Sequence, residues 1–218
     1  MEIVVKNLTK KFKDIMILDN INIEFDKGKI YGLVGKNGSG KTVFLKMLAG
    51  IYVPTEGTII CKGEDFNVTK SFPKSVRALI ENPTFIPDFT GLENLRMLAK
   101  IQNKIGDKEI LKTLEDVNLI EEKDKPFSKY SLGMKQKLGI AQVLMEDPDI
   151  ILLDEPFSAI EDESVLKIRR ILLEKKKEGK LILISTHIKE DIDKLADEIY
   201  KFENAKVVKI ENKNDKEA

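Results

Sequence analysis

The stretch Gly35-Lys36-Asn37-Gly38-Ser39-Gly40-Lys41-Thr42 decides how the rest of this 218-residue sequence is interpreted. It follows the apolar run KIYGLV at 29–34 and leads into the helix-forming run TVFLKMLA at 42–49. Glycines let the backbone turn tightly enough to aim several N–H groups at one point, and the following helix adds its positive end. The strand, loop and helix therefore predict a phosphate-binding P-loop.

Two side chains of this loop have separate expected roles. Lys41 is a mobile point charge that can reach the β- and γ-phosphates of ATP. The Thr42 hydroxyl is the expected Mg²⁺ ligand. We therefore predict ATP and Mg²⁺ as cofactors, with the nucleotide held by Gly35, Asn37, Gly38, Ser39, Gly40, Lys41 and Thr42.

A second motif, IILLDE at 150–155, is an apolar strand that ends in Asp154 and Glu155. P-loop NTPases hold Mg²⁺ with a carboxylate at the end of such a strand, so Asp154 is the expected metal residue. Glu155 lies one residue on, where it can polarise the attacking water as general base. Its presence favours ATP hydrolysis over nucleotide sensing alone.

Strand-like and helix-like segments alternate along the chain, which predicts an α/β fold with a mostly parallel sheet. We expect an N-terminal antiparallel β subdomain and a helical insert, with Thr90 and Glu93 forming a capping box and Asp107 capping a second helix. Strands are expected at 2–6, 20–26, 29–34, 58–61, 150–153 and 181–185, helices at 42–49, 134–145 and 189–196, and a hairpin around Asn204.

The expected organisation is a single ATPase domain. Residues 1–81 and 148–210 form its sheet-containing catalytic lobe, residues 82–147 its helical subdomain, and residues 211–218 a polar tail.

The composition narrows the possible partners. Thirty-seven basic residues balance thirty-seven acidic ones, which argues against nucleic acid as the main partner. Cys61 is the only cysteine, which excludes an intrachain disulfide and fits a reducing cytosol. The N-terminal run MEIVVKNLTKKF is not a secretory signal, and no apolar run approaches the roughly 18 residues that cross a bilayer.

The run YSLGMKQ at 130–136 resembles the LSGGQ signature of the ATP-binding subunits of ABC transporters. Ser131 and Gly133 match it, whereas Leu132 and Met134 depart from it. The resemblance implies two subunits packed head to tail with ATP between them. Ser131 and Gly133 of one subunit would then contact the γ-phosphate in the other subunit's P-loop, aided by the dipole of the signature helix.

Other positions take roles from the same resemblance. His187, in the run ISTH, would contact the γ-phosphate and the attacking water. Phe12 would stack on adenine, although a simple core or surface phenylalanine competes with that interpretation. The run PFSAIE at 156–161 would line the dimer interface, and its Glu161 replaces the usual aspartate, a change that either alters communication between the sites or is compensated by Asp162.

The departure at Glu81, where most members have glutamine, is the most informative. The resemblance implies that this residue ligands Mg²⁺ and senses the membrane partner. The run LIENPTF at 79–85 is similar to the subgroup that exports, or protects against, lantibiotics, bacitracin and other antimicrobial peptides. Phe85, Ile86 and Phe89 form an apolar cluster that either docks the membrane subunit or belongs to the core of the insert.

The family resemblance implies a cytoplasmic ATPase subunit, peripheral on the inner face of the membrane, that works as a homodimer or heterodimer with a transmembrane permease. A soluble ABC-type ATPase acting on a cytosolic assembly complex is the alternative. A chromosome or DNA-repair ATPase fits poorly, because the sequence between Lys41 and Asp154 holds no long coiled-coil insert.

Overall fold

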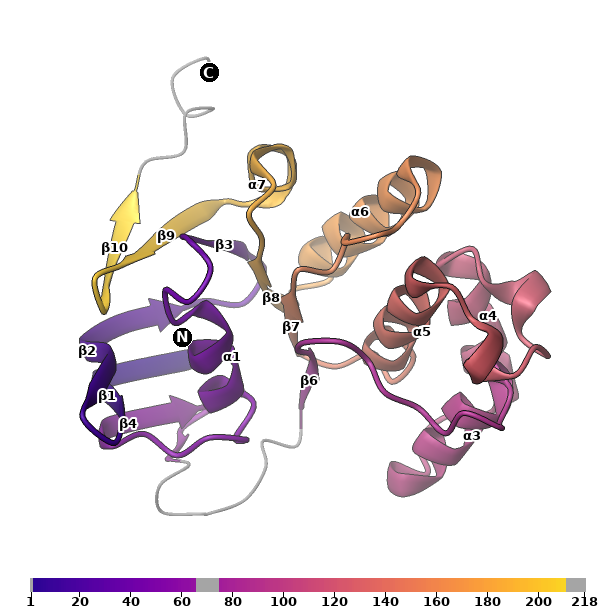
Figure 1. Cartoon of the computed structure of the whole chain (residues 1–218), viewed down its shortest axis with the longest axis horizontal. Coiled ribbons are helices and arrows are strands. Elements are labelled where there is room, and N and C mark those ends of the chain that lie inside the picture. Colours follow the sequence, from indigo (N-terminus) through magenta and orange to yellow (C-terminus); the bar gives the residue numbers. More distant parts are fainter. Residues whose placement is uncertain (1, 66–74, 211–218) are drawn as a thin grey trace.

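The computed structural model describes residues 2–65 and 75–210, which form two β-sheets with helices around and beside them (Figure 1). The larger sheet has the order β10-β9-β3-β8-β7-β6, and β10 is its antiparallel member among parallel neighbours. Its strands are β3 (Ile30–Val34), β6 (Val76–Leu79), β7 (Ile150–Asp154), β8 (Leu181–Ser185), β9 (Glu198–Glu203) and β10 (Lys206–Ile210).

The smaller sheet is antiparallel and has the order β2-β1-β4-β5. Its strands are β1 (Ile3–Phe12), β2 (Ile15–Phe25), β4 (Glu56–Cys61) and β5 (Glu64–Asp65). The predicted α/β fold, with a mostly parallel sheet and an N-terminal antiparallel β subdomain, is confirmed.

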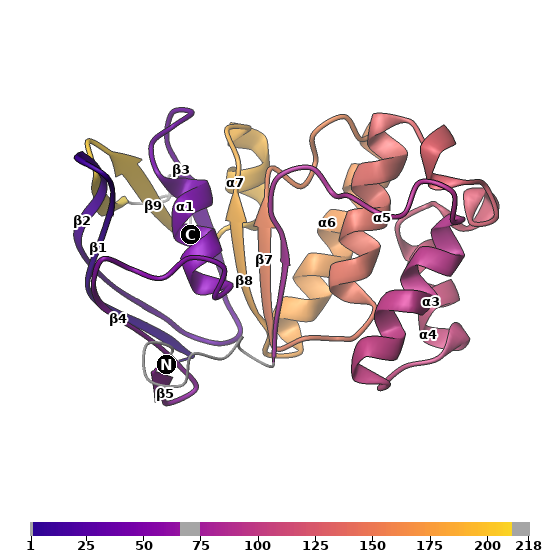
Figure 2. The same ribbon diagram turned by 60° about the horizontal axis from the view of Figure 1, so that its bottom comes forward.

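Helices cover both faces of the larger sheet, which explains why β7 and β8 are buried at every residue. Leu152 and Leu183 pack in the same apolar cluster as α1 (Lys41–Leu48). Their neighbours Leu153 and Ile184 pack in a second cluster with α6 (Asp162–Lys177). Figure 2 shows α1 between the two sheets and α6 on the other side of β7 and β8.

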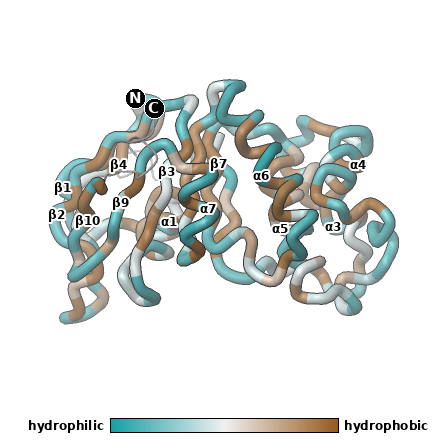
Figure 3. Tube along the Cα trace, turned by 90° about the horizontal axis from the view of Figure 1, so that it is seen from above, coloured by the Kyte–Doolittle hydropathy of each residue, from teal (hydrophilic) through white to brown (hydrophobic). Residues whose placement is uncertain are grey.

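The helical insert contains α3 (Gly91–Gln102), α4 (Asp107–Asp116) and α5 (Leu132–Leu144). The predicted capping box at Thr90 and Glu93 is confirmed, because each side chain accepts the other residue's backbone N–H. Hydrophilic residues are prominent on the outer edge of this region (Figure 3). No helix within residues 2–65 and 75–210 is long and apolar enough to cross a membrane.

Two local predictions were wrong. Gly106, not Asp107, is the N-cap of α4, and Asp107 instead pairs with Arg96 on α3. Strands β1 and β2 extend well beyond the predicted 2–6 and 20–26 and turn near Lys13. Leu8 and Thr9 of β1 are buried, but the strand then ends in two lysines and the exposed Phe12, so no apolar alternation marks this end in the sequence.

Strands β5 and β6 were not predicted, whereas the C-terminal elements agree with the sequence interpretation. Helix α7 spans Lys189–Leu195, and the hairpin of β9 and β10 turns at Asn204. Cys61 is a buried free thiol, and desolvation raises its pKa to about 11. The predicted polar tail, residues 211–218, lies outside the described residues, and the division into two subdomains remains an interpretation.

Candidate active site

The P-loop connects β3 to α1 at the carboxyl end of the parallel sheet. Gly38 and Gly40 have φ values of 78° and 103°, which side-chain-bearing residues rarely adopt. A Cβ on Gly35 would lie 2.5 Å from the carbonyl oxygen of Phe202. The glycines therefore allow the tight path that the sequence predicted, and α1 begins directly after it with its N-terminal N–H groups facing the loop.

Lys41 is held inside this loop. Its Nζ donates to the carbonyl oxygens of Gly35 at 2.7 Å and Lys36 at 3.2 Å, and the residue is 6% exposed. Desolvation lowers the pKa of Lys41, while the charges of Glu155 and Asp154 act in the opposite direction. The ammonium group therefore lies where the loop would receive phosphates.

Thr42 and Asp154 meet across the site. The Thr42 hydroxyl donates to Asp154 Oδ2 at 2.6 Å, and Asp154 is buried at the end of β7. A hydroxyl beside one carboxylate provides the hard oxygen ligands that Mg²⁺ prefers when nucleotide phosphates complete its shell. Clusters of three or more His, Cys, Asp or Glu residues suited to a metal are absent from the described chain, so a site formed by protein side chains alone is not indicated there.

Glu155 and His187 form the neighbouring pair. Glu155 has a φ of 47°, and its N–H donates to the Ser185 carbonyl at 2.7 Å, so the backbone turns sharply as β7 ends. His187 Nδ1 lies 2.9 Å from Glu155 Oε2, where a protonated ring nitrogen would donate to the carboxylate. A carboxylate oriented by an imidazole is a suitable general base for water.

Gln136 was missed as a site residue by the sequence interpretation. This buried side chain of α5 donates from Nε2 to the carbonyl oxygens of Glu155 at 3.1 Å and Pro156 at 3.2 Å. It thereby ties the signature helix to the backbone of the predicted general base. A polar residue among the buried positions of α5 was the available signal.

The signature residues lie apart from the P-loop of their own chain. Ser131 is exposed and caps α5 by accepting from the Met134 N–H at 3.2 Å. Helix α5 belongs to the region across β7 from α1 (Figure 1). A Cβ on Gly133 would lie 2.4 Å from the Ala159 carbonyl oxygen, so this glycine permits a close contact within the chain.

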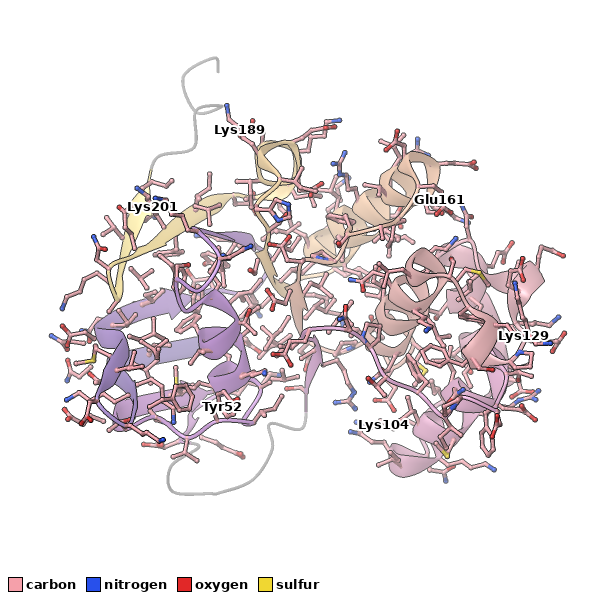
Figure 4. The ribbon with its side chains drawn as sticks, viewed as in Figure 1. Tyr52, Lys104, Lys129, Glu161, Lys189 and Lys201 are labelled. Carbon is pink, nitrogen blue, oxygen red and sulfur yellow. The ribbon has the colours of Figure 1, made fainter. Side chains whose placement is uncertain are left out.

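Glu161 is the N-cap residue of α6, and its carboxylate serves contacts within the chain (labelled in Figure 4). Oε1 accepts from Lys137 Nζ at 2.7 Å and Ser164 Oγ at 2.6 Å. Desolvation raises the pKa of Glu161, but these hydrogen bonds outweigh it and bring the pKa to about 2. Glu161 therefore stays charged and links α5 to α6.

Phe12 ends β1 and is 39% exposed, so it is not a core residue. Tyr52 approaches it edge-on with ring centroids 5.6 Å apart, and Lys10 Nζ lies 4.7 Å from the centroid of the Phe12 ring. These contacts steady an aromatic surface at the end of the β1–β2 hairpin. Adenine stacking on it remains a prediction.

Glu81 follows β6 in the left-handed backbone region, with a φ of 62°. Its Oε1 accepts a hydrogen bond from Lys46 Nζ of α1 at 2.7 Å. The predicted contact of Glu81 with Mg²⁺ therefore remains a prediction. Of the predicted docking cluster, Phe85 is buried in the insert core against Phe127, whereas Ile86 and Phe89 are partly exposed.

Comparison with known proteins identifies the family to which this fold and site belong. The family model described as "ABC transporter" matches residues 18–158, which is more than half of the chain. A solved ATP-binding subunit of an ABC transporter superposes with a TM-score of 0.88 at 24% identity, covering 99% of this chain and 91% of that one. A dimeric ATP-binding cassette bound to ADP and Pi gives 0.86 at 23% identity, covering 96% and 99%. At these identities the two structures support the fold.

Curated relatives are closer in sequence. The Bacillus subtilis (strain 168) ABC transporter ATP-binding protein YybJ is 50% identical, and the match covers 88% of each chain. The bacitracin transport ATP-binding protein BcrA of Enterococcus faecalis is 41% identical over 89% of this chain but only 64% of its own length. The lantibiotic transport ATP-binding protein SrtF of Streptococcus pyogenes is 33% identical over 88% and 83%.

The family match and these identities agree with the P-loop, the paired carboxylates and the signature helix. The chain therefore belongs to the ABC transporter family as an ATP-binding and ATP-hydrolysing subunit.

Proposed function

We propose that this subunit hydrolyses ATP as a head-to-tail dimer and thereby powers the export of, or protection against, antimicrobial peptides through a transmembrane partner. ATP-binding subunits of this family dimerise and work with such a partner. The names of two relatives, for bacitracin and lantibiotic transport, support the peptide class. The same relatives favour transport over the alternative of a cytosolic assembly ATPase. Attachment to the inner face of the membrane through the partner is part of the proposal.

The observation that carries the hydrolytic part is the pairing at the carboxyl edge of the sheet. Thr42 lies 2.6 Å from Asp154, and Glu155 lies 2.9 Å from His187. The first pair would hold Mg²⁺, which supplies positive charge beside the β- and γ-phosphates when it is bound. The second pair would orient the water, with Glu155 accepting its proton and His187 holding the carboxylate in place.

Lys41 has a separate part in this mechanism. Its ammonium group already lies inside the loop, bonded to two carbonyl oxygens. Exchanging those bonds for phosphate oxygens would place positive charge where negative charge grows in the transition state.

The exposed position of Ser131 motivates the dimer in the proposal. An exposed helix N-terminus whose capping hydroxyl faces outward from the chain's own P-loop is suited to a phosphate on a second chain. ATP bound between the two chains would then favour the closed dimer over separate subunits, and hydrolysis would remove that preference.

Resistance measurements test the proposed function. We expect the chain, co-expressed with its membrane partner in a sensitive bacterium, to raise the inhibitory concentration of bacitracin or a lantibiotic such as nisin. Glu155→Gln, expressed to the same level, should abolish this protection. Protection by the variant, or none from the wild type with either peptide class while it hydrolyses ATP, would contradict the peptide proposal.

A further inference from the structure

A lysine–glutamate pair lies beside the proposed metal and phosphate site. Lys46 Nζ is 2.7 Å from Glu81 Oε1. Lys46 lies one helical turn after Thr42 on the same face of α1. Glu81 follows β6, the parallel neighbour of β7, so it leaves the sheet at the edge where Asp154 lies. Both members of the pair therefore border the nucleotide site.

The position of Lys46 is fixed by more than this ion pair. Its side chain is only 15% exposed, and Nζ lies 5.3 Å from the ring centroid of Tyr52 (labelled in Figure 4). Tyr52 is in turn packed edge-on against Phe12. An ammonium over an aromatic ring is attracted to its face. Lys46 is thus steadied on one side by aromatic packing and offers its charge to Glu81 on the other.

Glu81 is held less firmly. Its side chain is 62% exposed, and its backbone lies in a region that costs non-glycine residues energy. An exposed ion pair of this kind contributes little to folding stability. The pair therefore matters less for folding stability than for the net charge at the edge of the nucleotide site, because Lys46 neutralises Glu81 there.

This neutralisation matters because the edge of the site is already acidic. Asp154 and Glu155 lie next to Lys41, and a triphosphate would bring further negative charge. A third carboxylate without a counter-ion would repel the nucleotide. Glutamine at position 81 would not have this effect, because it is neutral.

We propose that Lys46 is a positioning residue of the nucleotide site, which neutralises Glu81 and holds its carboxylate at the edge of the site. The pair thereby makes an acid compatible with a neighbouring triphosphate. This inference rests on the proposed function, because it requires ATP in the P-loop.

The test is ATP affinity of the intact chain by calorimetry, first with EDTA and then with Mg²⁺. Lys46→Met, which keeps most of the aliphatic stem, should weaken Mg²⁺-free ATP binding by about fivefold. Glu81→Gln should bind Mg²⁺-free ATP at least as tightly as the wild type. The double variant Lys46→Met/Glu81→Gln should return to within about twofold of Glu81→Gln, because the unpaired charge is gone. Mg²⁺ should reduce the defect of Lys46→Met, since it neutralises part of the phosphate charge.

Lys29→Met is the matched control. Lys29 also pairs with a glutamate at 2.7 Å, Glu198, but precedes β3 at the opposite end of the strand from the P-loop. This variant should bind ATP like the wild type. Lys46→Gln provides a second substitution if Lys46→Met does not fold.

Wild-type affinity in the Lys46 variants, or a defect that Glu81→Gln fails to rescue, would overturn this inference while leaving the proposed function intact. Failure of the wild type itself to bind ATP would instead refute the proposed function. Rescue by Glu81→Gln separates a charge effect from a packing defect, since neutralising Glu81 restores no packing around position 46.

Discussion

The P-loop edge and the signature helix differ in how complete they are within one chain. At the P-loop edge, Lys41 and Asp154 are almost fully buried and bonded to neighbours in the same chain. At the signature helix, Ser131 is exposed, and its hydroxyl and carbonyl oxygens accept hydrogen bonds from the first turn of its own helix. The difference indicates that one chain preorganises the catalytic groups at the P-loop edge, whereas the N-terminus of its signature helix lacks the phosphate that we expect a second chain to bring.

The largest effect should come from the preorganised region. Glu155→Gln removes the proton acceptor but keeps an oxygen that can bond to His187, so the site should remain assembled. We expect ATP hydrolysis to fall by about a hundredfold or more, as measured by phosphate release. ATP binding should persist, and gel filtration with ATP should show a stable dimer. Near-normal hydrolysis would remove Glu155 as the general base.

Lys41→Ala should produce the next largest effect. Removing the buried ammonium group takes away the charge that meets the phosphates, so ATP affinity should fall by about a hundredfold by calorimetry. Lys36→Ala is a suitable control, because this exposed neighbour offers the loop its backbone carbonyl and should retain ATP binding. Equal affinity of Lys41→Ala and the wild type would refute the phosphate site.

A smaller effect is expected at Ser131, at the N-terminus of the signature helix. Ser131→Ala should lower hydrolysis by about tenfold without weakening ATP binding to a single chain, because the lost hydroxyl acts across the dimer. Ser131→Asp keeps a capping side chain on α5 but places negative charge at the γ-phosphate. It should therefore be less active than Ser131→Ala. If Ser131→Asp were instead the more active variant, the helix cap alone would explain the effect of Ser131, and the role across the dimer would be contradicted.

The smallest effect concerns the link between α5 and α6. The pKa of Glu161 is lowered from 4.5 to about 2, so its ionised form is favoured by folding. The stability that this adds is present above about pH 4.5 and is lost as pH falls toward 2. Thermal melting should show Glu161→Gln less stable than the wild type at pH 7, with the gap narrowing as the pH falls through this range. A constant gap would exclude titration of Glu161 as its cause.

The sequence predicted the features that depend on local segments better than those that depend on contacts between distant ones. The P-loop, Asp154 and Glu155 are local features, because a strand leading into a loop fixes their positions. Their pairings with Thr42 and His187 follow from parallel strands that end at one edge, because His187 follows β8, the neighbour of β7, and Thr42 follows β3 on the other side of β8. The fold class was equally accessible, since buried parallel strands are continuously apolar.

Contacts between distant segments were not accessible in this way. Gln136 reaches the backbone of Glu155, and Lys46 reaches Glu81, through tertiary packing that no sequence period encodes. The burial of Phe85 likewise depends on Phe127, more than forty positions away by number. The extent of β1 was missed because its exposed end carries lysines in place of an apolar pattern.

The most direct test of the central claim is a crystal structure of Glu155→Gln with Mg²⁺ and ATP. We predict a head-to-tail dimer in which Ser131 Oγ of one chain lies about 3 Å from a γ-phosphate oxygen bound by the other chain's P-loop. ATP fully enclosed by one chain, with Ser131 facing solvent in both, would contradict the shared reaction centre.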